Sequence, residues 1–337
     1  MQGFHNILTL CNAIRPILEN WISMPSEMTA TLLFLLISIP IIIKSSDIFT
    51  EGASKLAKML GVSDFIIGIT IVALGTSLPE LASDSYASYI DHGQIAFGDI
   101  IGSNITNIAL ILGLTCVIKP LVIKHTEIYS GWIHLLILTL ASAFILISGG
   151  VGRIGGIFFI FAYIFYLKNS IEKYRELGIE TIEKNDWKKN IFEVLIGLTG
   201  ILIGAHLLVN SIIGLSTAFG ISEYLIALVL MSVGTSLPEL FVSVSAARKG
   251  YMTMALGNII GSNVANILWV LGAAAIIRPI RIDPELIFVQ LIFMLLLSVL
   301  LIIFKKSGYV IDRKEGAVLL VIYIVFVLVS ITFGRKA

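Results

Sequence analysis

Long apolar blocks separated by short polar stretches dominate this chain. Several of the blocks run for about 18 residues or more, the length that a helix needs to cross the hydrocarbon core of a bilayer. The pattern predicts ten membrane-spanning helices, at residues 29–46, 65–90, 95–118, 126–147, 152–170, 191–213, 223–247, 254–277, 285–304 and 315–334. We therefore expect an all-α membrane protein.

Two segments depart from this pattern. Residues 1–28 place apolar side chains along one face of a helix, which is typical of an amphipathic segment lying on the bilayer surface. Residues 171–190 interleave acidic and basic side chains and predict a solvated connector. The connector divides the ten spans into two groups of five, within residues 29–170 and 191–337.

The composition excludes a soluble fold. Of the 337 residues, 57% are hydrophobic and only 13% are charged, with a mean hydropathy of +0.97. A formal net charge of +1 indicates no nucleic-acid partner. Two cysteines, Cys11 and Cys116, fit neither a disulfide framework nor a cysteine-rich metal site. No cofactor is expected.

One stretch of the sequence occurs twice. Residues 75–113 and 234–272 align without a gap at an offset of 159 residues, and both contain Gly-Thr-Ser-Leu-Pro-Glu-Leu followed by Gly-Ser-Asn. Each group of five spans carries one copy. Because five is odd, two homologous units must enter the membrane from opposite sides, which is the inverted-repeat architecture of secondary transporters.

The basic residues predict which side of the membrane each loop faces. When the loops are assigned alternately to the two sides, 17 of the 23 lysines and arginines fall on one side. Basic loops stay in the cytoplasm. We therefore expect both termini outside, the connector inside, and the chain in the cell membrane.

Each copy contains one glutamate in a strongly apolar setting, Glu80 in the first and Glu239 in the second. A carboxylate at membrane depth is costly and usually functional. The adjacent proline and glycine are expected to break the helix and to free carbonyl oxygens around Ala73 and Ser232. Such backbone is tolerated in a membrane only where it is buried or lines a cavity.

Oxygen atoms surround these glutamates in the sequence. The repeated heptapeptide supplies hydroxyls, and the following span adds a serine and an asparagine four residues apart on one helix face. This set suits a hard cation such as Ca²⁺, and the lack of histidine and cysteine argues against zinc or copper. The candidate ligands are Ala73, Thr76, Ser77, Glu80, Asp84, Ser103, Asn107, Ser232, Thr235, Ser236, Glu239, Ser262 and Asn266.

The charge of the site indicates what kind of protein this is. One Ca²⁺ neutralises both glutamates, and Na⁺ ions would compete for the same oxygens. An empty site leaves two carboxylates repelling each other, so only the loaded protein should switch sides, as an antiporter does. The alternatives are a proton/Ca²⁺ antiporter, an intramembrane hydrolase with paired carboxylates and a passive cation channel. Repetition of every ligand, not only of the acids, argues against the hydrolase.

The two copies resemble the alpha repeats of the cation/calcium exchanger superfamily and are most similar to its sodium/calcium exchangers of archaeal type. The resemblance rests on Gly-Thr-Ser-Leu-Pro-Glu, followed 22 residues later by Gly-Ser-Asn, in both copies. It implies ten helices and exchange of three Na⁺ for one Ca²⁺. It also implies that Glu80 and Glu239 bind Ca²⁺, that the carbonyls and hydroxyls named above line sodium sites, and that Asn107 and Asn266 complete the centre.

The two copies differ at acidic positions. Asp84 stands where the second copy has Ser243, and Asp99 stands where it has Asn258. Asp84 is interpreted either as part of the site or as an exposed residue near its mouth, and Asp99 either as a site group or as a helix cap. Archaeal relatives often carry Asp where Asn266 stands, and in the family that Asp goes with potassium-dependent exchange. The resemblance therefore favours exchange without potassium.

Overall fold

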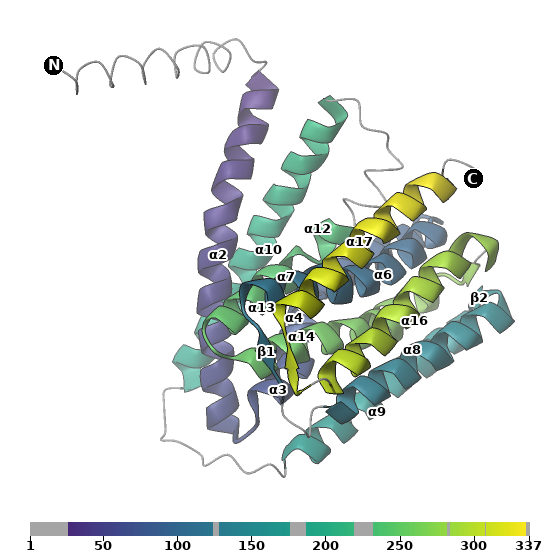
Figure 1. The fold of residues 1–337 in the computed structure, drawn as a ribbon. Coiled ribbons are helices and arrows are strands. Elements are labelled where there is room, and N and C mark those ends of the chain that lie inside the picture. The colour runs from purple at the N-terminus through teal and green to yellow at the C-terminus, as the bar shows by residue number, and fades with distance from the viewer. Residues whose placement is uncertain are drawn as a thin grey trace.

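The computed structural model describes residues 26–123, 128–175, 187–218, 232–281, 284–306 and 308–334. These residues form a bundle of helices, with four strands of two residues each (Figure 1). The all-α prediction is therefore confirmed. The predicted amphipathic segment, apart from its last three residues, lies outside the described residues, as do the middle of the connector and the first part of the span at 223–247.

Two long helices, α2 (Ser26–Leu60) and α10 (Trp187–Ala218), lie side by side at one edge of the bundle (Figure 1). They approach closely because α10 presents glycines to α2. A Cβ atom on Gly197 would lie 2.6 Å from the backbone nitrogen of Phe49, too close for any side chain. Small residues of this kind are typical of helix contacts inside membranes.

Helix α2 continues well beyond the predicted span at 29–46. Residues 47–60 remain helical because Phe49, Ala53 and Ala57 are buried at helical spacing. The predicted span at 29–46 stops just before Asp47. Charged side chains on the opposite face of the same helix do not interrupt it.

The second predicted span is a broken helix. It contains α3 (Asp64–Ile67), the π-helical segment η1 (Gly68–Val72) and α4 (Ala73–Thr76). After a bend of 45° the chain resumes as α5 (Leu78–Tyr89). The residue at the break is Ser77, with φ −85° and ψ 11°.

The second copy breaks at the matching position. Helix α12 (Ser232–Thr235) ends at Ser236, whose φ of −86° and ψ of 7° nearly equal those of its counterpart, and α13 (Leu237–Arg248) follows. The predicted break is confirmed in both copies. Its cause is the proline two residues after each break, which has no N–H to continue the helical ladder.

The centre of the bundle is formed by the third and eighth predicted spans. Each is continuous and contains a short π-helical segment in its middle, and 83% of the most apolar 18-residue window of each is buried inside the protein. The elements are α6 (Gly93–Thr106), η2 (Asn107–Leu112) and α7 (Gly113–Ile118) in the first copy, and α14 (Met252–Ala265), η5 (Asn266–Val270) and α15 (Leu271–Ile277) in the second.

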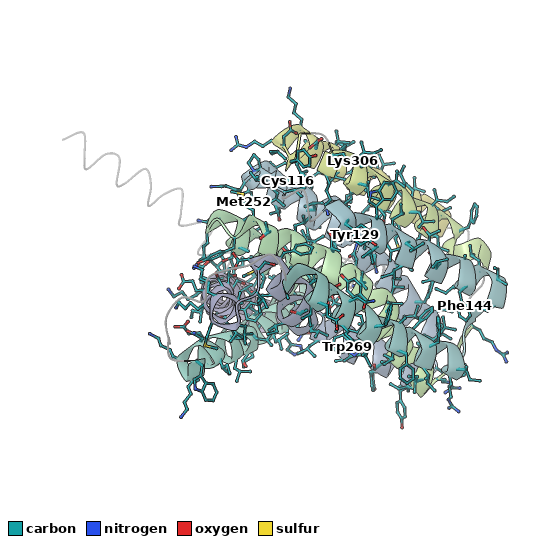
Figure 2. All side chains as sticks on the ribbon, turned by 90° about the horizontal axis from the view of Figure 1, so that it is seen from below. Cys116, Tyr129, Phe144, Met252, Trp269 and Lys306 are labelled. Carbon is teal, nitrogen blue, oxygen red and sulfur yellow. The ribbon has the colours of Figure 1, made fainter. Side chains whose placement is uncertain are left out.

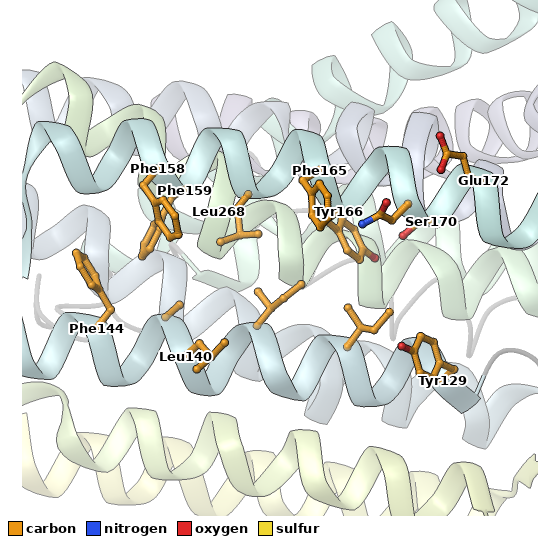
Figure 3. Close-up of a pocket in the computed structure, with 15 residues that line it drawn as sticks. Tyr129, Leu140, Phe144, Phe158, Phe159, Phe165, Tyr166, Ser170, Glu172 and Leu268 are labelled. Carbon is orange, nitrogen blue, oxygen red and sulfur yellow. The ribbon is translucent and has the colours of Figure 1, made fainter.

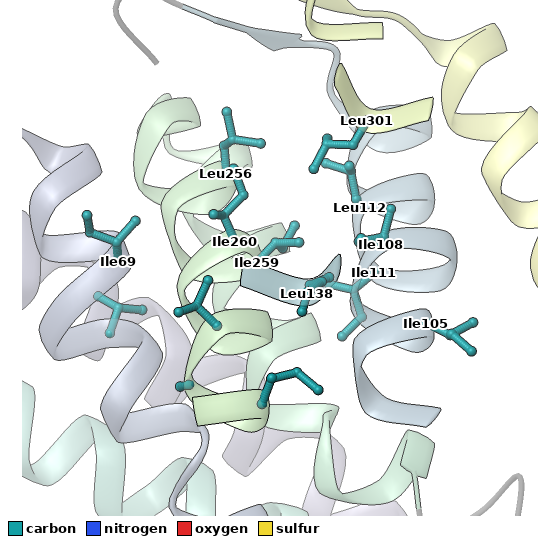
Figure 4. Packing of buried hydrophobic residues seen from close by; sticks show 14 of the residues in the cluster. Ile69, Ile105, Ile108, Ile111, Leu112, Leu138, Leu256, Ile259, Ile260 and Leu301 are labelled. Atoms are coloured by element: carbon teal, nitrogen blue, oxygen red, sulfur yellow. The ribbon is translucent and has the colours of Figure 1, made fainter. Parts of the chain in front are cut away.

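Branched aliphatic side chains pack around these central helices. Figure 4 shows Ile259 and Ile260 of α14 between Ile69 on one side and Ile108 on the other. The broken helix approaches α14 closely, because a Cβ on Gly257 would lie only 2.7 Å from the carbonyl oxygen of Phe65. The core therefore holds the broken helix against the central helices.

Four further helices lie at the outside of the bundle. Their outer faces expose large apolar side chains, such as Phe144 at the periphery in Figure 2, as expected for helices that face lipid. They are α8 (Ile128–Ser148), α9 (Arg153–Arg175), α16 (Pro284–Lys306) and α17 (Arg313–Gly334).

The short strands connect the first half of the chain, residues 29–170, to the second half, residues 191–337. Strand β1 (Leu121–Val122) pairs antiparallel with β4 (Val310–Ile311), and β2 (Gly150–Val151) pairs antiparallel with β3 (Ile280–Arg281). Each pair joins a loop of the first half to a loop of the second half. In both cases the charge pattern assigns the two paired loops to the same side of the membrane.

The described residues contain seven helices that are long and apolar enough to cross a membrane, or eight if the broken helix counts as one span. The remaining two predicted spans correspond to α13, preceded by residues outside the described part of the chain, and to the 22-residue helix α17. The count of ten stays a prediction. Arg153–Arg175 and Trp187–Ala218 also extend into the predicted connector from both sides.

Candidate cation site

The two glutamates of the repeated sequence come together in the middle of the bundle. Glu80 lies in the first turn of α5 and Glu239 in the first turn of α13, each just after a helix break. Both are 0% exposed. The two carboxylates interact electrostatically with each other, so the structure brings the acids of the two copies into one place.

Serines cross from each copy to the glutamate of the other. The hydroxyl of Ser77 donates a hydrogen bond of 2.9 Å to Oε1 of Glu239, and the hydroxyl of Ser236 donates one of 3.4 Å to Oε1 of Glu80. Since Ser236 and Glu239 are the repeat counterparts of Ser77 and Glu80, the two contacts are reciprocal. Ser262 also donates to Oε1 of Glu239, at 3.1 Å.

The carbonyl that loses its helical hydrogen-bond donor at the first break is that of Gly75, two residues beyond the predicted Ala73. The carbonyl oxygen of Ala73 accepts the backbone N–H of Ser77 at 3.0 Å, so the break does not free it. Pro79, which lacks an N–H, stands where a helix would supply the donor for the carbonyl of Gly75. The expectation of a freed Ala73 carbonyl is thus corrected.

The asparagines of the second layer begin the two π-helical segments, Asn107 in η2 and Asn266 in η5. Nδ2 of Asn107 donates to Oδ1 of Asn263 at 2.9 Å, and Asn263 donates to the carbonyl of Asn104 at 3.2 Å. The side chain of Asn266 is fully buried and makes no hydrogen bond within the described part of the chain. A buried amide without partners is costly, so this position is suited to a ligand.

Two of the predicted ligands, Thr76 and Thr235, contact residues that are not among the candidate ligands. The hydroxyl of Thr76 lies 3.2 Å from Oδ1 of Asn258, and the hydroxyl of Thr235 lies 3.5 Å from Oδ2 of Asp99. Asp99 is therefore not a helix cap: α6 begins six residues earlier, at Gly93, and Asp99 is 5% exposed inside it. The sequence indicated this contact layer only through the alignment of Asp99 with Asn258 in the two copies of the repeat.

Asp84 is not an exposed residue near the mouth of the site. It is 0% exposed and lies beside Asp99, and it also interacts electrostatically with Glu80. Its carboxyl group contacts that of Asp99, and its oxygens have no other hydrogen-bond partner among the described residues. The first copy thus adds two buried carboxyl groups behind Glu80, where the second copy has neutral side chains.

The described residues contain no group of three or more His, Cys, Asp or Glu side chains arranged to hold a metal ion. A cation between Glu80 and Glu239 would therefore depend on hydroxyl, amide and carbonyl oxygens for its remaining ligands. Ca²⁺ and Na⁺ accept such ligands, whereas zinc and copper prefer nitrogen and sulfur. Ser103, the counterpart of Ser262, makes no hydrogen bond to the described residues and adds a free hydroxyl.

A cavity of about 900 Å³ lies elsewhere, between α8 and α9 (Figure 3). Apolar side chains such as Leu140, Phe158 and Phe165 line most of it, and none of the predicted ligands does. It opens between two outer helices whose apolar side chains face outward. This cavity belongs to the lipid-facing surface and not to the candidate cation site.

Comparison with known proteins identifies related sequences and structures. The family model for sodium/calcium exchanger proteins matches residues 30–171 and residues 189–332. The sodium/calcium exchanger MaX1 of Methanosarcina acetivorans is 34% identical over 348 residues, which cover 89% of this chain and 98% of MaX1. The inner membrane protein YrbG of Escherichia coli is 32% identical over 263 residues, which cover 74% of this chain and 81% of YrbG.

A solved structure has the same fold. The sodium-calcium exchanger NCX_Mj, soaked with Na⁺ and Sr²⁺, superimposes with a TM-score of 0.80 at 33% sequence identity, and the match covers 88% of this chain and 98% of that chain. The similarity extends over nearly the whole length of both proteins.

Proposed function

Because the chain belongs to the sodium/calcium exchanger family, we propose that it exchanges Na⁺ for Ca²⁺ across the membrane by alternating access. Membership of this family makes the chain a multi-pass integral membrane transporter and not an enzyme. The names of MaX1 and NCX_Mj specify sodium and calcium for those two proteins. The choice of ions, their ratio and the ligands are our proposal for this chain.

The reciprocal contacts between the copies carry this proposal. Ser77 reaches Glu239 and Ser236 reaches Glu80, so neither copy holds a complete set of oxygens by itself. A cation bound between the two glutamates would bind both copies at once. A rearrangement of one copy against the other could then change the side from which the same site is open, as alternating access requires.

The proposed ligands follow from this geometry. Glu80 and Glu239 would bind Ca²⁺ directly, with the hydroxyls of Thr76 and Thr235 beside them. Na⁺ would use the same carboxylates together with carbonyl, hydroxyl and amide oxygens around them. These further ligands are proposed to come from Ser77, Ser103, Asn107, Ser232, Ser236, Ser262 and Asn266.

The ratio of three Na⁺ to one Ca²⁺ that we propose follows from the family resemblance, and the charge of the site determines how much charge such a cycle moves. If Glu80 and Glu239 are ionised and the buried carboxyl groups of Asp84 and Asp99 are protonated, the empty site carries −2, Ca²⁺ makes it neutral, and three Na⁺ make it +1. An ionised Asp84 would make the empty site −3. One net positive charge then moves with the sodium in each cycle. A potential of 100 mV biases such a cycle by about 2.3 kcal/mol. The neutral side chain of Asn266 supports exchange without potassium.

The topology that we propose is ten spans in two inverted five-helix repeats, with both termini outside the cell membrane. The strand pairs support it, because β1 with β4 and β2 with β3 each join loops that the charge pattern assigns to one side. An ion pair of 2.7 Å between Arg278 and Asp91 joins the loop that contains β3 to one further loop assigned to the outside.

The experiment is uptake of ⁴⁵Ca²⁺ into proteoliposomes loaded with Na⁺, with the membrane potential clamped by valinomycin. Three positive charges leave for every two that enter, so an inside-positive potential should accelerate uptake and an inside-negative one should slow it. Vesicles loaded with N-methylglucamine are the control without sodium.

Three outcomes would contradict parts of this proposal. Uptake that does not depend on voltage would exclude the three-to-one ratio. Uptake driven by an imposed proton gradient, with sodium absent, would identify a proton/Ca²⁺ antiporter instead. Uptake that, without valinomycin, requires potassium in the external solution together with Ca²⁺ would contradict exchange without potassium.

A further inference from the structure

Behind the two threonines of the candidate site lie two side chains that the proposed ligand set does not include. Asn258 contacts Thr76 and Asp99 contacts Thr235. Both contacts join one copy to the other, since Asn258 and Thr235 belong to the second copy and Thr76 and Asp99 to the first. Asp99 and Asn258 are repeat counterparts, as are Thr76 and Thr235.

The hydrogen bonds of Asn258 determine which way its amide faces. Nδ2 donates to the main-chain carbonyl of Glu239 at 3.4 Å and to the hydroxyl of Ser243 at 3.0 Å. A carbonyl oxygen can only accept, so this end of the amide must be the nitrogen. The other end, Oδ1, therefore faces Thr76, and the Thr76 hydroxyl is the donor in that contact.

A hydroxyl has one proton and two lone pairs. When Thr76 donates its proton to Asn258, its lone pairs stay available for a cation. Other acceptors compete for that proton, because the carbonyl of Ala73 lies 3.4 Å away and the Glu239 carboxylate is within hydrogen-bonding reach of the hydroxyl. Donation to Glu239 would direct the proton toward the cation position and occupy a carboxylate that Ca²⁺ needs.

Asp99 presents an oxygen to Thr235 in the same manner as Asn258 presents one to Thr76. The contact of 3.5 Å is longer, but the acceptor is of the same kind and the position is the repeat counterpart. Both acceptors are almost fully buried, with Asn258 at 0% and Asp99 at 5% exposed. Water from the bulk cannot replace them as the acceptor.

We propose that Asn258 and Asp99 are positioning residues for cation binding: each accepts the hydroxyl proton of the threonine of the other copy and so directs the lone pairs of that threonine toward the ion. This inference rests on the proposed function, because the ion is the one exchanged there. It requires only an acceptor oxygen at each position, which explains why an amide and a carboxyl group can occupy equivalent places.

The test concentrates on Asp99, because replacing Asn258 would also break its hydrogen bonds to the main-chain carbonyl of Glu239 and to Ser243. Asp99→Leu also removes the contact with the Asp84 carboxyl, which Asp99→Asn retains. Asp99→Leu removes the acceptor, Asp99→Asn keeps it, and Thr235→Val removes the hydroxyl at nearly constant shape. The variants are compared by the KM and kcat for Ca²⁺ in sodium-driven uptake and by the increase in melting temperature that Ca²⁺ causes in the purified protein. Asp91→Asn, at an exposed carboxylate, is the matched control.

We expect Asp99→Leu and Thr235→Val each to raise the KM for Ca²⁺ by about tenfold, with kcat within about twofold of wild type. Asp99→Asn and Asp91→Asn should stay within about twofold in KM. The double variant Asp99→Leu/Thr235→Val should be no worse than either single variant, because both remove the same interaction. The calcium-induced increase in melting temperature should fall in the same order.

Several results would overturn the inference. An unchanged KM in Asp99→Leu would show that the acceptor is not needed, and a double variant with the product of the two single effects would show that Asp99 does not act through Thr235. A loss in Asp99→Asn equal to that in Asp99→Leu would assign the effect to charge. If Asp99→Leu does not fold, Asp99→Ala takes its place with the same expectations. Failure of the proposed function is distinguishable from failure of this inference, because the wild-type protein itself would then show no sodium-driven Ca²⁺ uptake.

Discussion

The two copies of the repeated sequence hold their glutamates unequally, although the motif around each glutamate is identical. Oε1 of Glu239 accepts hydrogen bonds from Ser77 at 2.9 Å and from Ser262 at 3.1 Å. Oε1 of Glu80 accepts one from Ser236 at 3.4 Å. The hydroxyl of Ser103, which corresponds to Ser262, makes no hydrogen bond within the described residues.

The layer of side chains behind the motif also differs between the two copies. In the second copy, Asn258 and Ser243 form a neutral hydrogen-bonded pair. In the first copy, Asp99 and Asp84 occupy these positions and interact electrostatically with Glu80. An identical motif therefore supplies the same ligand atoms, while its surroundings set how firmly each carboxylate is held without a cation.

The largest effect is expected from replacing either glutamate. These variants test whether both glutamates are needed for Ca²⁺ transport although their hydrogen bonds differ. Glu80→Gln and Glu239→Gln should each reduce sodium-driven ⁴⁵Ca²⁺ uptake by about 100-fold or more, because Ca²⁺ then keeps only half of its neutralising charge where water is excluded. Gel filtration of the purified variants checks that they fold. Near-normal uptake by either variant would remove that glutamate from the site.

A smaller effect should reveal the unequal hydrogen bonds. Ser77→Ala removes the shorter bond to Glu239 and should raise the KM for Ca²⁺ by about fivefold, whereas Ser236→Ala removes the longer bond to Glu80 and should raise it by about twofold. Ser83→Ala is the control, because the Ser83 hydroxyl donates to the main-chain carbonyl of Glu80 and not to its carboxylate. Equal effects of the two site variants, or the reverse order, would contradict the comparison.

Much of the fold follows from the sequence, because each apolar block must be helical in a membrane. The breaks after Thr76 and Thr235 were predictable from the prolines that follow them. The full length of α2 was not, since its continuation to Leu60 depends on burial against α10 by Phe49 and its neighbours. That contact joins helices far apart in the chain, and no local pattern encodes it.

The residues of the candidate site were predictable from the sequence, but the hydrogen bonds between them were not. The repeat identified Glu80, Glu239 and the serines, yet which serine would reach which glutamate depends on how the two copies pack. The same packing brings Asp99 to Thr235 of the other copy. Alignment of the copies marked Asp99 and Asn258 as unequal counterparts, but it could not show which threonine each would contact.

The central claim is that both copies together make a single cation site. Equilibrium binding of ⁴⁵Ca²⁺ to the purified protein tests it most directly. We predict one tightly bound Ca²⁺ per chain, displaced by Na⁺, and loss of that binding in Glu80→Gln and in Glu239→Gln alike. Two bound Ca²⁺ per chain, with one retained in each single variant, would contradict the claim, because each copy would then bind its own ion.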